Sequence, residues 1–259
     1  MSGVREPSKL LQVAEARAVA ELAAFAVTAP IWRLAPSGDG HSVLVLPGFM
    51  ASDRSTQILR TVLASRGYDV HGWALGTNTG PSVEVLDGID RRLGQVFART
   101  GRPVTVLGWS LGGIYARELA RRSPGRVRQV ITLGSPFRMT PDDRSSVSTL
   151  FEELNDLADG RLHALVPEPQ RPPLQVPSTA IYSRTDGVVR WHTCIDEAGP
   201  RRENIEVRGS HCGLGWNLSA LYATVDRLAQ PPGLWAPFRA PLALRLQYPK
   251  PVSWSARAA

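Results

Sequence analysis

One ten-residue stretch, VTVLGWSLGG at positions 104–113, constrains the fold of this chain more than any other. Its first four residues are apolar and mostly β-branched, and the run is too short for a helix, so it predicts a buried strand. From Leu111 onward, apolar residues recur at helical spacing until Pro124 and Gly125 end the pattern. A strand that turns directly into a helix is therefore expected, with Ser110 at the turn.

The glycines around Ser110 suit such a tight turn. Gly108 and Gly112 have no side chain to collide where the strand meets the helix, and they leave the serine hydroxyl exposed. Free N–H groups and the positive end of the helix dipole lie beside that hydroxyl. The motif resembles the nucleophile elbow of the α/β-hydrolase superfamily, on its esterase and lipase side. A glycine-rich turn with a bystander serine is the alternative.

Strand and helix patterns alternate along residues 41–133, which is typical of a doubly wound parallel sheet. Strands are expected at 43–46, 68–73, 104–107, 127–133, 179–182 and 205–207, and helices at 52–66, 82–97, 111–122 and 217–228. Ser52 or Asp53 would cap the first of these helices. The resemblance covers about residues 38–230. It implies an α/β architecture in which helices flank a mostly parallel sheet, with a small helical cap inserted.

Residues 137–177 interrupt this alternation. They contain one amphipathic helix pattern, which includes Phe151 and Leu154, and then a proline-dense segment. Their place in the chain is that of the cap insertion in the superfamily, and we expect Phe151 and Leu154 to contact the substrate there. A long crossover helix with a rigid linker is the alternative. Residues 231–259, rich in Pro and Trp, are expected to pack on the domain as a tail.

Residues 1–37 are expected to form a helical extension. Residues 10–27 are rich in Ala, Leu and Val, but Glu15, Arg17 and Glu21 interrupt them, which excludes a transmembrane span and the apolar core of a signal peptide. An amphipathic helix that packs on the domain is expected, with a membrane-surface anchor as the alternative. Because no export signal is recognised, we expect a cytoplasmic protein.

The formal net charge of +7 raises the question of a nucleic-acid partner. The basic residues are nearly all arginines, since only Lys9 and Lys250 are lysines, and no nucleic-acid-binding motif accompanies them. A solvated, arginine-rich surface is expected, and no nucleic-acid partner. Cys194 and Cys212 match neither a disulfide framework nor a common zinc motif, so no metal and no cofactor are expected.

A serine nucleophile needs a base that takes its proton, and the base needs an acid that orients it. In a parallel sheet such groups lie at the carboxyl ends of strands. His211 follows the last expected strand, in the loop Gly-Ser-His-Cys-Gly, and Asp186 follows the strand before it. The chain order Ser110, Asp186, His211 is the one that the superfamily uses. His192 is the competing base.

The tetrahedral intermediate of acyl transfer needs two preorganised hydrogen-bond donors. One candidate is the N–H of Leu111, at the start of the helix after the serine. The other is the N–H of Phe49, in the loop after the first strand, with Met50 as the alternative. No histidine precedes Gly48, which departs from the common His-Gly loop of the superfamily. Met50 and Trp109 are expected to contact the substrate.

These residues predict a serine hydrolase that cleaves carboxylic esters through an acyl-enzyme, with a small-molecule ester or a lipid as its substrate. A thioesterase or an acyltransferase of the same fold would carry the same three residues. A non-catalytic binding protein is the alternative from another class, although a degraded site usually loses one member of the triad first.

Overall fold

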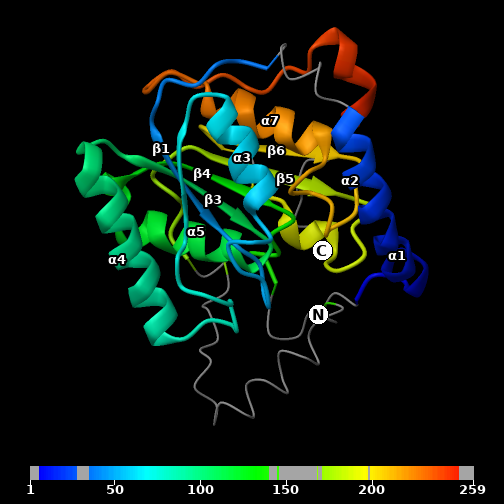
Figure 1. Cartoon of the computed structure of the whole chain (residues 1–259), viewed down its shortest axis with the longest axis horizontal. Helices are drawn as coiled ribbons and strands as arrows, with labels where there is room; N and C mark the ends of the chain where they lie inside the picture. Colours follow the sequence, from blue (N-terminus) through cyan, green and yellow to red (C-terminus); the bar gives the residue numbers. More distant parts are fainter. Residues whose placement is uncertain are drawn as a thin grey trace.

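The computed structural model describes residues 6–27, 35–139, 145, 168, 171–197 and 199–250. In this part of the chain a six-stranded sheet has the order β2-β1-β3-β4-β5-β6, and all neighbouring strands are parallel (Figure 1). The strands are β1 (Ser42–Leu46), β2 (Asp69–Gly72), β3 (Val104–Trp109), β4 (Val127–Leu133), β5 (Ser178–Ser183) and β6 (Arg202–Val207). The strand order reverses between β1 and β3, the place where open α/β sheets bind their ligands.

Helices cover both faces of the sheet. α3 (Gln57–Ser65) and α7 (Leu218–Leu228) pack on one face, and α4 (Val83–Thr100) and α5 (Leu111–Arg122) on the other (Figure 1). Successive strand residues point to opposite faces. Accordingly, Val43 and Val45 of β1 lie in the core beside α3 and α7, whereas Leu44 and Leu46 lie in the core beside α4 and α5. The predicted doubly wound parallel sheet is confirmed. Two short 3₁₀ helices, η3 (Pro124–Arg126) and η5 (Trp191–Cys194), lie in the connections.

Most predicted elements differ from the observed ones only at their ends. β4 spans residues 127–133 as predicted, and α5 begins at residue 111 as predicted. α4 continues beyond the predicted residue 97 to Thr100, because Gly101 ends it in the left-handed conformation, with φ 65°. At its start, the Ser82 hydroxyl accepts the N–H of Val85 at 3.2 Å, a side-chain cap.

The first predicted helix begins later than expected. α3 starts at Gln57 rather than directly after Ser52 or Asp53. The Asp53 carboxylate instead accepts the N–H groups of Trp73 and Ala74, at 3.0 Å each, where β2 ends. The predicted cap is therefore wrong. A side chain that caps a helix and one that accepts N–H groups at the end of a distant strand have the same chemistry. The local sequence pattern therefore does not distinguish the two roles.

The N-terminal segment consists of α1 (Lys9–Ala14), the short 3₁₀ helix η1 (Glu15–Arg17) and α2 (Ala18–Val27). It is helical, as expected, but its apolar side chains are largely turned outward. Leu10, Val13 and Val19 are 79%, 74% and 75% exposed, and α1 buries none of its residues. The segment does lie on the domain, with Ala18 buried and Phe25 packed against the core beside α3 and α7. Polar side chains make most of the contacts, as described below.

The described part of the C-terminal tail contains one short 3₁₀ helix, η6 (Leu242–Gln247), where the sequence predicts no element. Tyr248 donates its hydroxyl to the Ser219 carbonyl of α7 at 2.8 Å, and its ring meets the Phe238 ring edge to face. Of the predicted cap, residues 140–144, 146–167 and 169–170 lie outside the described residues, and Phe151 and Leu154 with them. The cap stays a prediction.

Two arginines are buried and are exceptions to the expected solvated, arginine-rich surface. Arg117 of α5 and Arg227 of α7 are only 3% and 4% exposed. The Nη1 atom of Arg117 lies 2.9 Å from Asp196 Oδ2, and its Nε atom lies 3.0 Å from Glu168 Oε1. Its guanidinium also lies over the Phe137 ring, 4.1 Å from the ring centre. Because a buried charge must be paired and hydrogen-bonded, this cluster links α5 to the segments before and after β5.

Replacing Arg117 with Met is expected to destabilise the protein by about 3–5 kcal/mol, because the buried Asp196 carboxylate loses its guanidinium partner and Glu168 keeps only Arg121. Urea unfolding followed by circular dichroism measures the loss. Arg122→Met is the matched control on the same helix. Its side chain is 41% exposed and pairs with Glu118, so its removal is expected to cost about 1 kcal/mol or less. Equal losses in both variants would contradict the role of the buried cluster.

Candidate active site

Ser110 makes the whole turn between β3 and α5. β3 ends at Trp109 and α5 begins at Leu111, so a single residue reverses the chain, and it does so with φ 54° and ψ −124°. A positive φ is uncommon for any residue other than glycine, and such strained residues cluster at functional sites. The N–H of Ser110 donates to the Leu133 carbonyl of β4 at 2.8 Å, which fixes the turn on the neighbouring strand.

Glycines allow the backbones around this turn to approach closely. A Cβ atom on Gly108 would overlap the Gly112 carbonyl, and one on Gly112 would overlap the Leu46 carbonyl at the end of β1. A Cβ atom on Gly113 would overlap the Ser135 side chain, in the loop after β4. The predicted reason for glycine at positions 108 and 112, the lack of space for a side chain, is confirmed.

Asp186 and His211 are brought together in the loops that follow β5 and β6. His211 Nδ1 lies 2.6 Å from Asp186 Oδ2, and the two residues are 6% and 3% exposed. The other carboxylate oxygen, Asp186 Oδ1, accepts the N–H groups of Val188 and Val189 at 2.8 Å each. The carboxylate is therefore held from both sides, with one oxygen on its own loop and one on the imidazole.

The pKa of His211 reflects two opposed effects. Burial alone would lower it, but the Asp186 carboxylate, with a smaller contribution from Glu15, raises the pKa above the ordinary value of 6.5. The protonated imidazole is thus favoured by its surroundings. A histidine in such a setting is well suited to accept a proton from a nucleophile.

The serine and the Asp186–His211 pair meet the same short segment at the end of β4. Ser110 is bonded to the carbonyl of Leu133, the residue before Gly134. A Cβ atom on Gly134 would lie 3.1 Å from His211 Nδ1 and 3.3 Å from Asp186 Oδ2. Gly134 also has φ 51°, which a side chain would strain. Glycine at this position leaves room for the pair.

The remaining described histidines have other surroundings. His41 is buried at 1% exposure and bonded to Asp39 and to Thr105 Oγ1, the latter at 2.9 Å. His71 of β2 pairs with Asp69 on the same strand. His192, the competing base, stacks on Trp191 with 3.6 Å between ring centroids, and burial, together with two nearby arginines, lowers its pKa. His211 is the histidine that the structure places on Asp186.

In the loop after β1, the backbone N–H of Met50 is already bonded. Met50 has φ 57°, and its N–H donates to the Asn78 carbonyl at 2.7 Å. This bond occupies the donor, so the alternative that Met50 supplies the second oxyanion donor is contradicted. Leu111 is the first residue of α5, where backbone N–H groups have no intrahelical acceptor. Phe49 and Leu111 stay the predicted donors.

Asn78, which the sequence analysis did not single out, holds this loop in place. Its Nδ2 donates to the Pro47 carbonyl at 3.0 Å, and its backbone N–H donates to the Ala51 carbonyl at 2.8 Å. Its side-chain oxygen accepts the hydroxyl of Tyr115, on α5, at 3.1 Å. Asn78 is completely buried. In the sequence, this asparagine lies in a loop with two glycines and two threonines, which is typical of a turn residue. No local pattern therefore predicts its role.

Trp109 contacts the loop that carries His211. It is 7% exposed, its indole N–H donates to the His211 carbonyl at 3.2 Å, and its ring meets Trp216 edge to face. The predicted contact of Trp109 with a substrate stays a prediction. So does that of Met50, whose side chain is 46% exposed.

The two thiols are poor competitors for the role of nucleophile. Burial, and secondarily the Glu15 carboxylate, raises the pKa of Cys212 to about 11, and burial raises the pKa of Cys194 well above its ordinary value. Both thiols are therefore protonated at neutral pH. Within the described residues, no group of His, Cys, Asp and Glu side chains is arranged to hold a metal ion. No described helix is both long enough and apolar enough to cross a membrane.

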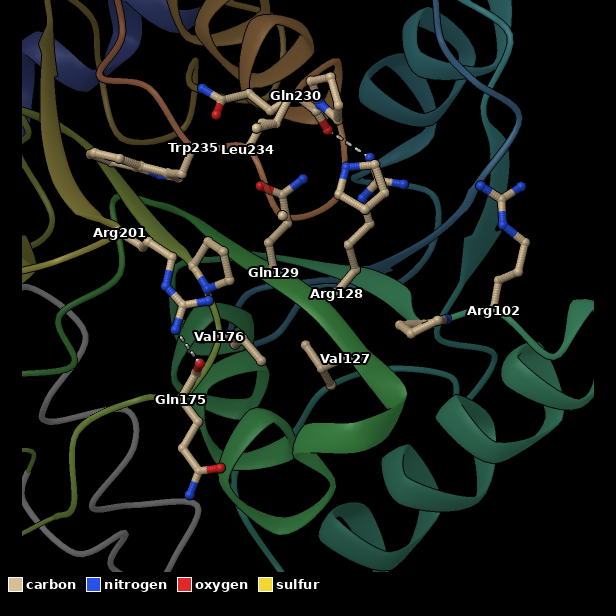
Figure 2. A pocket seen from close by; sticks show the side chains of 15 residues that line it. Arg102, Val127, Arg128, Gln129, Gln175, Val176, Arg201, Gln230, Leu234 and Trp235 are labelled. Atoms are coloured by element: carbon tan, nitrogen blue, oxygen red, sulfur yellow. Dashed lines mark hydrogen bonds between the residues drawn. The ribbon is translucent and has the colours of Figure 1, made fainter.

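A pocket of about 310 Å³ lies at the opposite edge of the sheet (Figure 2). It is lined by the residues before β3 and β5, by the start of β4 and by residues 230–235. Two of its arginines donate to backbone carbonyls, Arg128 to that of Gln230 at 2.7 Å and Arg201 to that of Gln175 at 3.1 Å (Figure 2). It lies at the amino ends of the strands, away from the edge where α/β sheets carry their catalytic groups.

Comparison with known proteins finds relatives that match part of the chain. No protein family model matches the chain. It is similar to pimeloyl-[acyl-carrier protein] methyl ester esterases. It is 33% identical over 106 residues to the one from Aliivibrio fischeri, which is 40% of either chain. With the one from Neisseria meningitidis it shares 37% over 68 residues, which is 26% of this chain and 22% of that protein. The chain thus spans less than half the length of the curated relatives that it matches.

Solved structures give the fold. Aspergillus fumigatus lipase B superposes with a TM-score of 0.53 at 19% identity, over 74% of this chain and 53% of that one. A Bacillus licheniformis lipase gives 0.53 at 14% identity, over 75% and 94%. The monoacylglycerol lipase of Paleococcus ferrophilus gives 0.52 at 12% identity, over 75% and 96%. The chain has the α/β-hydrolase fold.

Replacing Asn78 with Ala is expected to lower the free energy of unfolding by about 1–3 kcal/mol, since the Tyr115 hydroxyl and the Pro47 carbonyl lose a buried partner. Tyr115→Phe is the matched control. It removes only the hydroxyl, and the side-chain oxygen of Asn78 keeps the N–H of Gly80, so a loss of about 1 kcal/mol or less is expected. Urea unfolding of both variants measures the difference, and an Asn78 variant as stable as the wild type would refute the assignment.

Proposed function

We propose that this protein is a serine hydrolase that cleaves carboxylic esters through an acyl-enzyme. The observation that carries the proposal is the strained backbone of Ser110 at the strand–helix turn, because a positive φ at a non-glycine residue persists only where the surroundings enforce it. The partial similarity to methyl ester esterases supports the same reaction class.

In the proposed reaction, Ser110 Oγ attacks the ester carbonyl carbon while His211 Nε2 takes the hydroxyl proton. Asp186 holds Nδ1–H of the imidazole and stabilises the imidazolium that forms. The N–H groups of Phe49 and Leu111 receive the oxyanion. The C–O bond to the alcohol then breaks, and the alcohol leaves with the proton from His211.

The second half of the reaction repeats the first with water. His211 takes a proton from a water molecule, which attacks the acyl carbon, and His211 then gives that proton to Ser110 Oγ as the acyl–oxygen bond breaks, which releases the carboxylic acid and restores the serine. No group outside the chain is required, so no cofactor is proposed. The proposed substrate is a small-molecule ester or a lipid, since the matched relatives are named for a methyl ester and the superposed structures are lipases.

A fluorophosphonate probe is expected to label Ser110 and no other serine, because labelling requires both an activated hydroxyl and an oxyanion site. Peptide mass spectrometry locates the label. Ser110→Ala is expected to abolish labelling and to lower kcat for a nitrophenyl ester by about 10³-fold or more. Stoichiometric labelling that survives in Ser110→Ala would overturn the proposal.

The rate of ester hydrolysis is expected to rise with pH through a midpoint above 6.5. Only the neutral imidazole accepts a proton, and the pKa of His211 is raised, so the group becomes neutral at a higher pH than a free histidine. The dependence of kcat/KM on pH for a neutral ester measures the midpoint. His211→Ala is expected to abolish this rise of the rate with pH, the pH limb, and His192→Ala is expected to leave it in place. Loss of the pH limb in His192→Ala would show that His192, and not His211, is the base.

A further inference from the structure

The N-terminal segment lies against the two loops that carry Asp186 and His211. In Figure 1, α1 and α2 (dark blue) run along the side of the molecule next to β5 and β6. The guanidinium of Arg17 donates to Thr185 Oγ1 at 3.0 Å, and the indole N–H of Trp216 donates to the Ala18 carbonyl at 3.1 Å. These contacts join residues that are far apart in sequence, and none of them is a hydrogen bond between strands of the sheet.

The carboxylate of Glu15 accepts three backbone N–H groups from these loops. Its Oε1 accepts the N–H of Gly187 at 2.7 Å and the N–H of His211 at 2.9 Å. Its Oε2 accepts the N–H of Cys212 at 3.0 Å. The first donor follows Asp186 directly, and the second belongs to the histidine itself. One side chain therefore ties the loop after β5 to the loop after β6, next to Asp186 in the first loop and at His211 itself in the second.

Glu21 makes a second contact, to the His211 loop only. Its two carboxylate oxygens accept the N–H and the hydroxyl of Ser210, at 2.9 and 3.0 Å. The Ser210 hydroxyl in turn accepts the N–H of Gly213 at 3.0 Å. Glu21 thus fixes the shape of one loop, whereas Glu15 spans both.

Two glycines in the loops leave space for the segment. A Cβ atom on Gly187 would overlap the Leu11 carbonyl of α1, and one on Gly213 would overlap Glu21 Oε2. Gly187 does not have a positive φ, so the close approach of Leu11, and not a left-handed backbone, requires glycine there. Residues on both sides of the contact are thus matched to a closely docked segment.

We propose that Glu15 is a positioning residue of the active site, which sets the distance between Asp186 and His211 and places a second negative charge beside the imidazole. This inference rests on the proposed hydrolase function. A carboxylate that accepts three N–H groups is held more firmly than one that accepts a single bond, and hydrogen bonds to a charged acceptor are the stronger ones. Misplacement of the pair by a fraction of an ångström is costly for catalysis.

The negative charge of Glu15 favours the protonated form of His211. The titratable and charged groups around the His211 loop are Asp186, Glu15, Glu21, Cys212 and Arg17. After the effect of burial and that of Asp186, Glu15 contributes to raising the pKa of His211. Loss of the Glu15 charge therefore lowers the pKa of His211 and moves the pH limb to lower pH.

The test compares three variants of the full chain on a nitrophenyl ester across pH. Glu15→Gln keeps the size and removes the charge, so kcat is expected to fall about tenfold and the limb to move to lower pH. Glu15→Asp keeps the charge but is one methylene shorter, so it cannot reach both loops, and kcat is expected to fall with the limb near its wild-type position. Glu21→Gln, the matched control, removes a charge from the same segment and is expected to leave the limb unmoved.

Each outcome decides the inference. Wild-type kcat and pH limb in Glu15→Gln would overturn it, as would equal losses in Glu15→Gln and Glu21→Gln with an unmoved limb, which would indicate docking of the segment alone. The titration of His211 by imidazole NMR is a readout independent of activity, and its midpoint is expected to be lower in Glu15→Gln. If the wild type hydrolyses no ester and Ser110 is not labelled, the proposed function fails, and the NMR midpoint still tests whether Glu15 acts on His211.

Discussion

The close approach of three backbones at glycine positions determines the geometry of the candidate site. The end of β1, the end of β3 and the first turn of α5 come together where Gly108 and Gly112 stand, and any side chain there would overlap a carbonyl group. Because there is so little space, β3 continues as a strand up to Trp109 and α5 begins at Leu111. Ser110 has to reverse the chain alone. The strained backbone, which costs on the order of 1–3 kcal/mol, is a consequence of this packing and is maintained by it.

The same edge of the sheet collects the other groups, because parallel strands all end there. The loops after β1, β2, β5 and β6 all lie at this edge. What fixes them relative to one another is not the sheet but a few polar side chains bonded to backbone groups. Asn78 holds the loop after β1, Asp186 joins its own loop to His211, and Glu15 joins the loops after β5 and β6. Each satisfies donors or acceptors that loops otherwise leave open.

The strands, the helices and the elbow could be predicted because their signals are local. Apolar periodicity and glycine spacing are properties of ten or so neighbouring residues, and the doubly wound sheet, β4 and the start of α5 follow from them. The roles of Asp53, Asn78 and Glu15 could not be predicted for a physical reason. Each bonds a backbone group that lies far away in sequence, and backbone groups are identical at every position. The sequence separation is 20 for Asp53 to Trp73, 31 for Asn78 to Pro47, and 196 for Glu15 to His211.

The N-terminal segment shows how this distinction affects the site. Leu10, Val13 and Val19 are exposed, whereas the carboxylates of Glu15 and Glu21 face the domain. Apolar burial is non-directional and would hold such a helix without fixing its register. Carboxylate–amide bonds are directional and place Glu15 at one set of N–H groups. These bonds therefore fix the position of the segment, and under the proposal above they also set the geometry of the Asp186–His211 pair.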